Sequence, residues 1–204
     1  MKIDIVDITS ESLTSLYKSK TVLYLAAAAA VVQAVLYLGN ANFALAIVLG
    51  IASFFVMPLI FGSVFAAKIN PKLDAKGAFN KIKKNYVNLI LTTILGGIII
   101  FLGFVALVIP GIYLAIRLCI GAVIAAIEGL GPVDSLKKSW KITSGKWWPI
   151  FGTLLLTGII VVILDGIFAV VTVPIGLGII GALASGFFGT ALSVAAVLLY
   201  QELK

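Results

Sequence analysis

The sequence predicts an all-α integral membrane protein, a six-transmembrane-helix bundle that forms a single domain over residues 1–204. Apolar residues make up 62% of the chain and charged residues only 11%. That charged share is less than half of the roughly 25% that a soluble domain carries. The apolar residues also fall into six runs, each close to the roughly 20 residues that a helix needs to cross a membrane. The placement of the lysines supports the same count.

The six expected spans cover residues 21–38, 43–66, 87–108, 111–128, 148–170 and 178–200. The first, third and fifth connections, around Asn40, Ile109-Pro110-Gly111 and Pro174-Ile175-Gly176, carry no charge. The second and fourth connections are rich in lysine. With six spans, all 14 lysines lie on one side, which the positive-inside rule assigns to the cytoplasm. We therefore expect a multi-pass protein of the plasma or inner cell membrane, with both termini cytoplasmic.

Both basic connections have the pattern of amphipathic helices lying in the membrane interface, at about 74–86 and 132–143. Apolar residues recur there at helical spacing, with lysines on the opposite face. Such helices either anchor the loops or recognise anionic lipid headgroups, each lysine contributing roughly 1 kcal/mol near the surface. The expected headgroup contacts are Lys81, Lys83, Lys84, Lys137, Lys138 and Lys141. The expected interfacial anchors are Trp140, Trp147 and Trp148.

The order of parts is similar in the two halves of the chain. A span is followed by a basic interfacial helix, another span and a proline-glycine turn, at Pro110-Gly111 in one half and Pro174-Ile175-Gly176 in the other. Because both basic helices fall on the same side, the pattern indicates a possible parallel internal repeat.

Small residues recur every four positions along the last span. Lipid provides no hydrophobic drive for helix association, so such stripes favour close backbone packing. They fit packing within the bundle or, alternatively, a face between copies of the chain. The stripe consists of Gly181, Ser185, Gly189 and Ser193, and the first span has a similar one at Ala26, Ala30 and Ala34.

Two ionised side chains lie well inside the apolar runs, Arg117 and Asp165. Counting residues from the neighbouring turns puts both at a similar depth on the outer side. Buried charges in a membrane are costly and are usually paired. The sequence therefore predicts an Arg117–Asp165 ion pair, either structural or part of a polar site. Glu128, at the cytoplasmic end of its span, is expected to pair with a nearby lysine or to cap a helix end.

Catalytic and metal sites are not predicted. The chain has no histidine and a single cysteine, which removes the commonest general base and makes an intramolecular disulfide impossible. No phosphate-binding loop, metal-ligand spacing or nucleophile motif is present. We expect a protein without cofactors or enzymatic activity. The bases are confined to particular loops, so the net charge of +7 indicates an anionic lipid surface and not nucleic acid.

The segment 108–152 carries a recognisable pattern. Ile109-Pro110-Gly111 is followed by Arg117-Leu118, Glu128 and Gly131-Pro132, and then by the basic helix that ends at Thr143-Ser144-Gly145. This pattern resembles the membrane-domain family of glycerophosphoryl diester phosphodiesterases and the related YciC-like membrane proteins. The resemblance implies about six transmembrane helices and an auxiliary role connected with lipids or the cell envelope. The soluble phosphodiesterase barrel of some members is absent, so the resemblance does not imply their activity.

Three functions fit these observations. The first is a non-enzymatic membrane protein that organises, senses or helps to move lipids. The second is a small transporter or channel with a polar site near Arg117 and Asp165. The third is a scaffold subunit that binds another membrane protein or a second copy of the chain. The excess of lysine over arginine, with abundant isoleucine, favours a prokaryotic source.

Overall fold

The computed structural model of the protein describes residues 3–39, 42–174 and 177–204, and these ranges contain helices and no β-strand. The expected turn residues Asn40, Ile175 and Gly176 lie outside the described residues. The helices are α1 (Ile5–Lys18), α2 (Lys20–Gly39), α3 (Phe43–Ile69), α4 (Ala75–Ala106), α5 (Val108–Leu118), α6 (Gly121–Glu128), α7 (Pro132–Ile142), α8 (Trp147–Thr172) and α9 (Gly178–Leu203). The predicted all-α fold class is confirmed.

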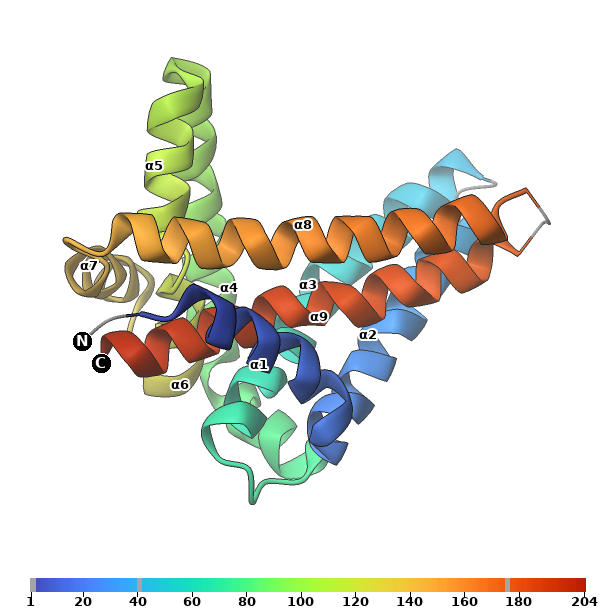
Figure 1. Cartoon of the computed structure of the whole chain (residues 1–204), viewed down its shortest axis with the longest axis horizontal. Helices are drawn as coiled ribbons and strands as arrows, with labels where there is room; N and C mark the ends of the chain where they lie inside the picture. Colours follow the sequence, from blue (N-terminus) through green and yellow to red (C-terminus); the bar gives the residue numbers. More distant parts are fainter. Residues whose placement is uncertain (1–2, 40–41, 175–176) are drawn as a thin grey trace.

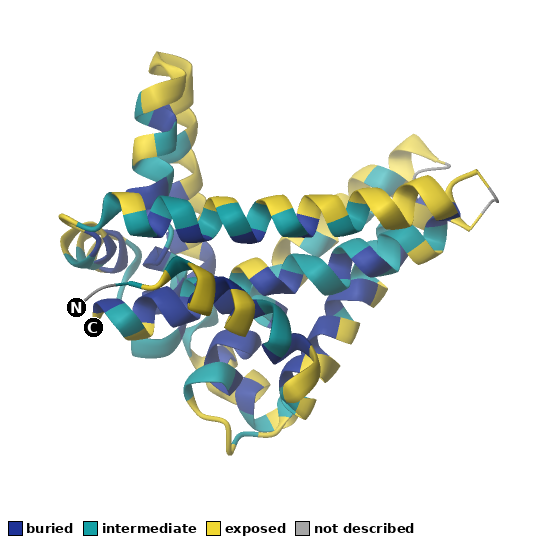
Figure 2. Ribbon diagram, viewed as in Figure 1, coloured by how far each residue is buried: buried dark blue, intermediate teal, exposed yellow. Residues whose placement is uncertain are grey.

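Six helical segments of the described chain are long and apolar enough to cross a membrane: α2, α3, α4, the α5–α6 pair, α8 and α9. Large apolar side chains cover their outer faces, with Phe101 65%, Val170 75% and Ile109 81% exposed. Figure 2 shows this exposure along α5 and the far half of α8. Exposed apolar surface of this extent fits lipid as the solvent. The chain is a multi-pass membrane protein.

The helices form a body with one projecting hairpin (Figure 1). Helices α8 and α9 lie side by side, α2 packs along α9, and α3 packs between α2 and α4. Helix α5 packs back along α4, and this hairpin points away from α8. Both termini and α7 lie at the left end of the view, and the adjoining ends of α8 and α9 lie at the far right.

The first basic segment is not a separate interfacial helix, so the prediction for residues 74–86 is wrong. It is the beginning of α4, which runs without interruption to Ala106. Asp74 caps the helix by accepting a hydrogen bond from Gly77 N at 2.8 Å. No proline follows in α4, and Ile82 and Leu89 are buried on one continuous face. The second segment does form a separate helix, α7, so the order of elements differs between the two proposed repeats.

The third connection also differs from the prediction. The chain leaves α4 at Leu107, whose extended backbone (φ −167°, ψ 153°) separates it from α5. Pro110 lies in the first turn of α5, where its missing N–H costs no helical hydrogen bond. The turn therefore comes two residues earlier than the Ile109-Pro110-Gly111 position expected from the sequence.

Helix α1 was not expected. Asp4 caps it by accepting from Val6 N and Asp7 N at 3.0 and 3.1 Å. Its buried face, which includes Ile8 and Leu16, packs against α9, α8 and α2. An isolated helix of this length is marginal in water, so the docking accounts for most of its stability.

Helices α2 and α9 approach each other closely at Gly186. A methyl group added there would lie 2.5 Å from Ala30 Cα and 2.6 Å from Ala29 O. Ala26, Ala30 and the rest of the predicted α2 stripe are buried at this contact. Of the predicted α9 stripe, Gly181 packs against α8, where an added methyl would lie 3.0 Å from Thr172 Oγ1, whereas a methyl added at Gly189 would meet nothing within 4 Å. Gly186, outside that stripe, is the residue that allows the backbones to meet.

Candidate functional site

The fourth span is broken between α5 and α6, and α7 covers the break. The Arg117 carbonyl accepts hydrogen bonds from Ser139 Oγ at 2.9 Å and Thr143 Oγ1 at 3.2 Å. Both hydroxyl side chains belong to fully buried residues. A carbonyl at a helix end needs such a partner, because burial without one costs free energy. The two hydroxyls therefore fasten α7 to the end of α5.

The Arg117 side chain lies under α7 and not in an ion pair. Its residue is 5% exposed, and its Cζ atom is 4.3 Å from the centroid of the Trp140 ring and 6.0 Å from that of Tyr113. The salt bridges in the described ranges are Lys68–Glu11 and Lys138–Glu128. Arg117 Nε has no hydrogen-bond partner there. The main neighbours of this buried cation are aromatic ring faces, which attract positive charge.

Asp165 lies elsewhere, so the predicted Arg117–Asp165 pair is wrong. Tyr113 stacks on Trp147 at the start of α8, with ring centroids 6.4 Å apart. Asp165 is 18 residues further along α8, which is about 27 Å at 1.5 Å per residue. There it lies beside Ser185 of α9. Arg117 therefore faces Trp140 and Tyr113, Asp165 lies beside Ser185, and the two charges do not face each other.

The three tryptophans predicted as interfacial anchors lie close together, and Trp140 lies against Arg117. We call Tyr113, Trp140, Trp147, Trp148 and Phe151 the aromatic cluster. Trp140 packs edge-to-face on Tyr113, and Trp147 stacks on Phe151 with centroids 4.9 Å apart. Trp140 is 40% and Trp148 is 74% exposed. The cluster joins α5, α7 and the start of α8.

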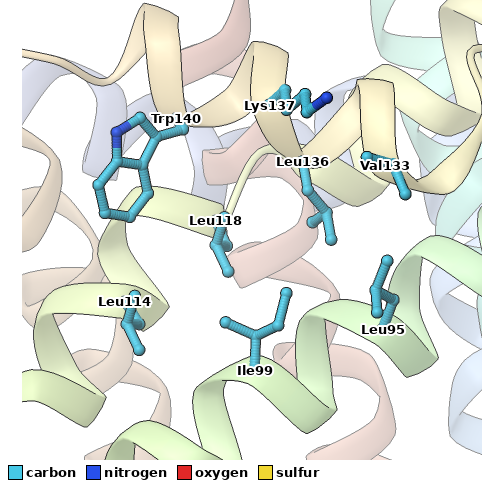
Figure 3. A pocket seen from close by; sticks show the side chains of 8 residues that line it. All are labelled: Leu95, Ile99, Leu114, Leu118, Val133, Leu136, Lys137 and Trp140. Atoms are coloured by element: carbon cyan, nitrogen blue, oxygen red, sulfur yellow. The ribbon is translucent and has the colours of Figure 1, made fainter.

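An apolar pocket of 310 Å³ lies between α4, α5 and α7 (Figure 3). We call it the α7 pocket. In Figure 3, Val133 and Leu136 reach into it from α7, and Ile99 points toward them from α4. The Lys137 ammonium lies on the α7 side, away from Ile99. The lining residues are Leu95, Ile99, Leu114, Leu118, Val133, Leu136, Lys137 and Trp140.

A second cavity of 540 Å³ lies on the other side of α5, against the aromatic cluster. Ile109, Ile112 and Tyr113 line it, and their spacing places them on one face of α5. Leu114 and Leu118, which line the α7 pocket, lie on the opposite face. Helix α5 therefore separates two apolar cavities.

The lysines expected to contact headgroups differ in their surroundings. Lys138 pairs with Glu128, which also accepts a hydrogen bond from Tyr200 Oη at 2.6 Å. These contacts connect α6, α7 and α9. The remaining five lysines are exposed, and within the described residues none has a carboxylate partner: Lys81, Lys83, Lys84, Lys137 and Lys141.

Sequence reasoning missed two asparagines that hold the lower end of the fourth span. Asn85 Nδ2 donates to the Ala126 carbonyl and Asn88 Nδ2 to the Gly129 carbonyl, both at 2.9 Å. Gly129 has φ +70°, a left-handed conformation that ends α6. Two amides three residues apart, where the apolar part of α4 begins, were the available signal. Ser139 on α7 and Thr143 at the C-cap of α7, four residues apart, were the corresponding signal for the break.

No cluster of three or more potential metal ligands is found in the part of the chain that the structure describes. Comparison with protein families matches residues 13–202 to a family described as Domain of unknown function (DUF7847). No curated protein and no solved structure matches the chain. The family description assigns no activity, so the resemblance of residues 108–152 to the phosphodiesterase membrane domains stays a prediction.

Proposed function

We propose that this chain, which belongs to the family described as Domain of unknown function (DUF7847), is a non-enzymatic membrane protein. In this proposal it binds and organises anionic lipids on its lysine-bearing side. The observation that carries this proposal is a group of five exposed lysines, Lys81, Lys83 and Lys84 on α4 and Lys137 and Lys141 on α7. They have no carboxylate partner among the described residues, and on α7 Lys137 and Lys141 flank Trp140, whose ring is exposed. We call these five lysines the lysine platform.

Charge and aromatic rings have complementary roles in this proposal. Lysine ammonium groups attract lipid phosphates, and indole rings settle at the level of the headgroups. Helix α7 supplies both groups and is fastened to the bundle through Ser139 and Thr143. Because the helix backbone is fixed, only the lysine side chains lose conformational freedom on binding, which favours affinity. By the positive-inside rule, this side faces the cytoplasm.

The transporter alternative was based on Arg117 and Asp165 sharing one polar site. Because the two residues lie far apart and the cavities beside α5 are apolar, that argument no longer favours transport. For the scaffold alternative, the described residues show no specific contact surface. Lipid organisation is the function that the named residues support best.

The test is native mass spectrometry of the protein released from bilayers of equal parts phosphatidylglycerol and phosphatidylcholine. One variant replaces Lys81, Lys83, Lys84, Lys137 and Lys141 by Gln. The matched control replaces five other exposed lysines by Gln, Lys18, Lys20, Lys72, Lys76 and Lys204, so that the net charge falls equally. We expect the platform variant to lose most of the preference for phosphatidylglycerol and the control to keep most of it. Equal preferences in both variants would reject the proposal.

A further inference from the structure

We infer that the α7 pocket binds one acyl chain of an anionic phospholipid, with its phosphate at Lys137 and Trp140. This inference rests on the proposed function, since it takes α7 to lie at the anionic surface. It goes beyond general attraction of lipid to a charged side. It assigns a single, defined lipid site between α4, α5 and α7.

The chemistry of the pocket wall selects a hydrocarbon chain. Apart from the Lys137 side chain and the edge of the Trp140 indole, the lining consists of aliphatic groups. Such a cavity does not hold ordered water, because water needs two or more polar partners. A hydrocarbon chain can fill it without leaving any buried polar group unpaired.

The size of the pocket suits a small apolar occupant. The volume of 310 Å³ is at the lower end of the ~300–1,000 Å³ range of small-ligand sites. A single flexible chain fits this space.

The single charge gives the bound lipid its direction. In Figure 3, the Lys137 ammonium lies on the α7 side of the pocket, while Leu95, Ile99 and Leu114 lie on the α4 and α5 side. Lysine extends its apolar stem along such a wall and keeps its ammonium at the surface. Lys137 has no carboxylate partner among the described residues, so it is available to a phosphate. A lipid of the lysine-side leaflet would meet the ammonium with its phosphate and place its chain below α7.

The roof of the pocket is held in place before any lipid binds. Leu136 packs over Gly121, where an added methyl would lie 2.8 Å from Leu136 Cδ2. Arg117 holds the Trp140 ring from within the protein, and Ser139 and Thr143 hold the helix that carries it. Arg117 is therefore a positioning residue, since it acts on the site through Trp140.

The test uses the full-length protein in bilayers containing phosphatidylglycerol that carries a photoreactive diazirine on one acyl chain. Crosslinked residues are mapped by peptide mass spectrometry. We expect crosslinks in the segments 95–99 and 114–118. Ile99→Trp, which fills the pocket, should lower their yield at least fivefold. The matched control is Ile98→Trp, because Ile98 is 51% exposed and does not line the pocket.

Folding is controlled by size-exclusion chromatography, and Leu114→Phe serves as a second filling variant if Ile99→Trp aggregates. Lys137→Gln should leave crosslinking by a diazirine phosphatidylcholine unchanged and lower crosslinking by the diazirine phosphatidylglycerol.

The site would be overturned if no crosslinks formed in residues 95–118. Equal crosslink yields in the pocket-filling and control variants would also overturn it. If the site is overturned while the five-lysine variant still loses its lipid preference, the proposed function stands without it. If the five-lysine variant keeps its lipid preference while Ile99→Trp still removes the crosslinks, the acyl-chain site is supported and the proposed role of the lysine platform is rejected.

Discussion

The guanidinium carbon of Arg117 lies 4.3 Å from the centroid of the Trp140 ring, and the two side chains connect the end of α5 to α7. A charge that a membrane would exclude is thus held against an aromatic face, close to the lysine-bearing helix. The same residue accepts two hydrogen bonds from α7 through its carbonyl. Arg117 therefore contributes to the position of α7 by both its side chain and its backbone.

Coupling between Arg117 and its neighbours can be measured by two double-mutant cycles. Arg117→Leu and Trp140→Leu should be coupled by about 0.5–2 kcal/mol, because they remove the same cation–aromatic contact. Arg117→Leu and Asp165→Leu should be additive within about 0.5 kcal/mol, since the residues do not meet. Thermal unfolding in detergent provides the free-energy differences. Additivity in the first cycle together with coupling in the second would contradict the arrangement.

The hydroxyls that cover the helix break should matter for stability. The double substitution Ser139→Ala and Thr143→Val leaves the Arg117 carbonyl without its two α7 donors, at a cost of about 1–3 kcal/mol. We expect a lower midpoint of thermal unfolding, roughly 2–4 °C per kcal/mol for a chain of this size. Ser144→Ala, one position further and exposed, is the control and should leave the midpoint unchanged. A double variant as stable as the control would show that these hydrogen bonds do not fasten α7.

Two glycines of α9 form a second matched pair. Gly186→Ala pushes a methyl group into the backbone of α2 and should cost about 1–3 kcal/mol through overpacking. Gly189→Ala meets nothing within 4 Å and should be neutral or slightly stabilising. The readout is the fraction of monodisperse protein that remains after heating in detergent. Equal losses for the two variants would contradict the α2–α9 crossing.

The number of spans could be predicted because hydropathy and lysine placement are independent consequences of insertion into a membrane. Helix boundaries could not be predicted as well. The continuity of α4 depends on Ile82 and Leu89 facing one buried surface, which the polar residues between them obscure. The break after Leu118 has no proline to signal it, and its carbonyl partners Ser139 and Thr143 lie more than 20 residues away in sequence.

The charged residues were harder to place than the helices. Counting residues from a turn gives depth only for straight, parallel spans, and the α4–α5 hairpin points away from α8. The sequence therefore predicted that Arg117 and Asp165 pair, because it contains no other charge well inside the apolar runs. The aromatic partners of Arg117 were visible in the sequence only as membrane-interface residues. Their convergence depends on α7 folding back over α5.

The central claim is that the lysine-bearing side, with α7, lies at the cytoplasmic surface. Its most direct test is labelling of single cysteines in a Cys119→Ala background with a reagent that does not cross membranes. Ser144→Cys, exposed between α7 and α8, should react only after the cells are permeabilised, and Ile109→Cys, 81% exposed at the start of α5, should react in intact cells. Reaction of Ser144→Cys in intact cells, with Ile109→Cys protected, would contradict the account.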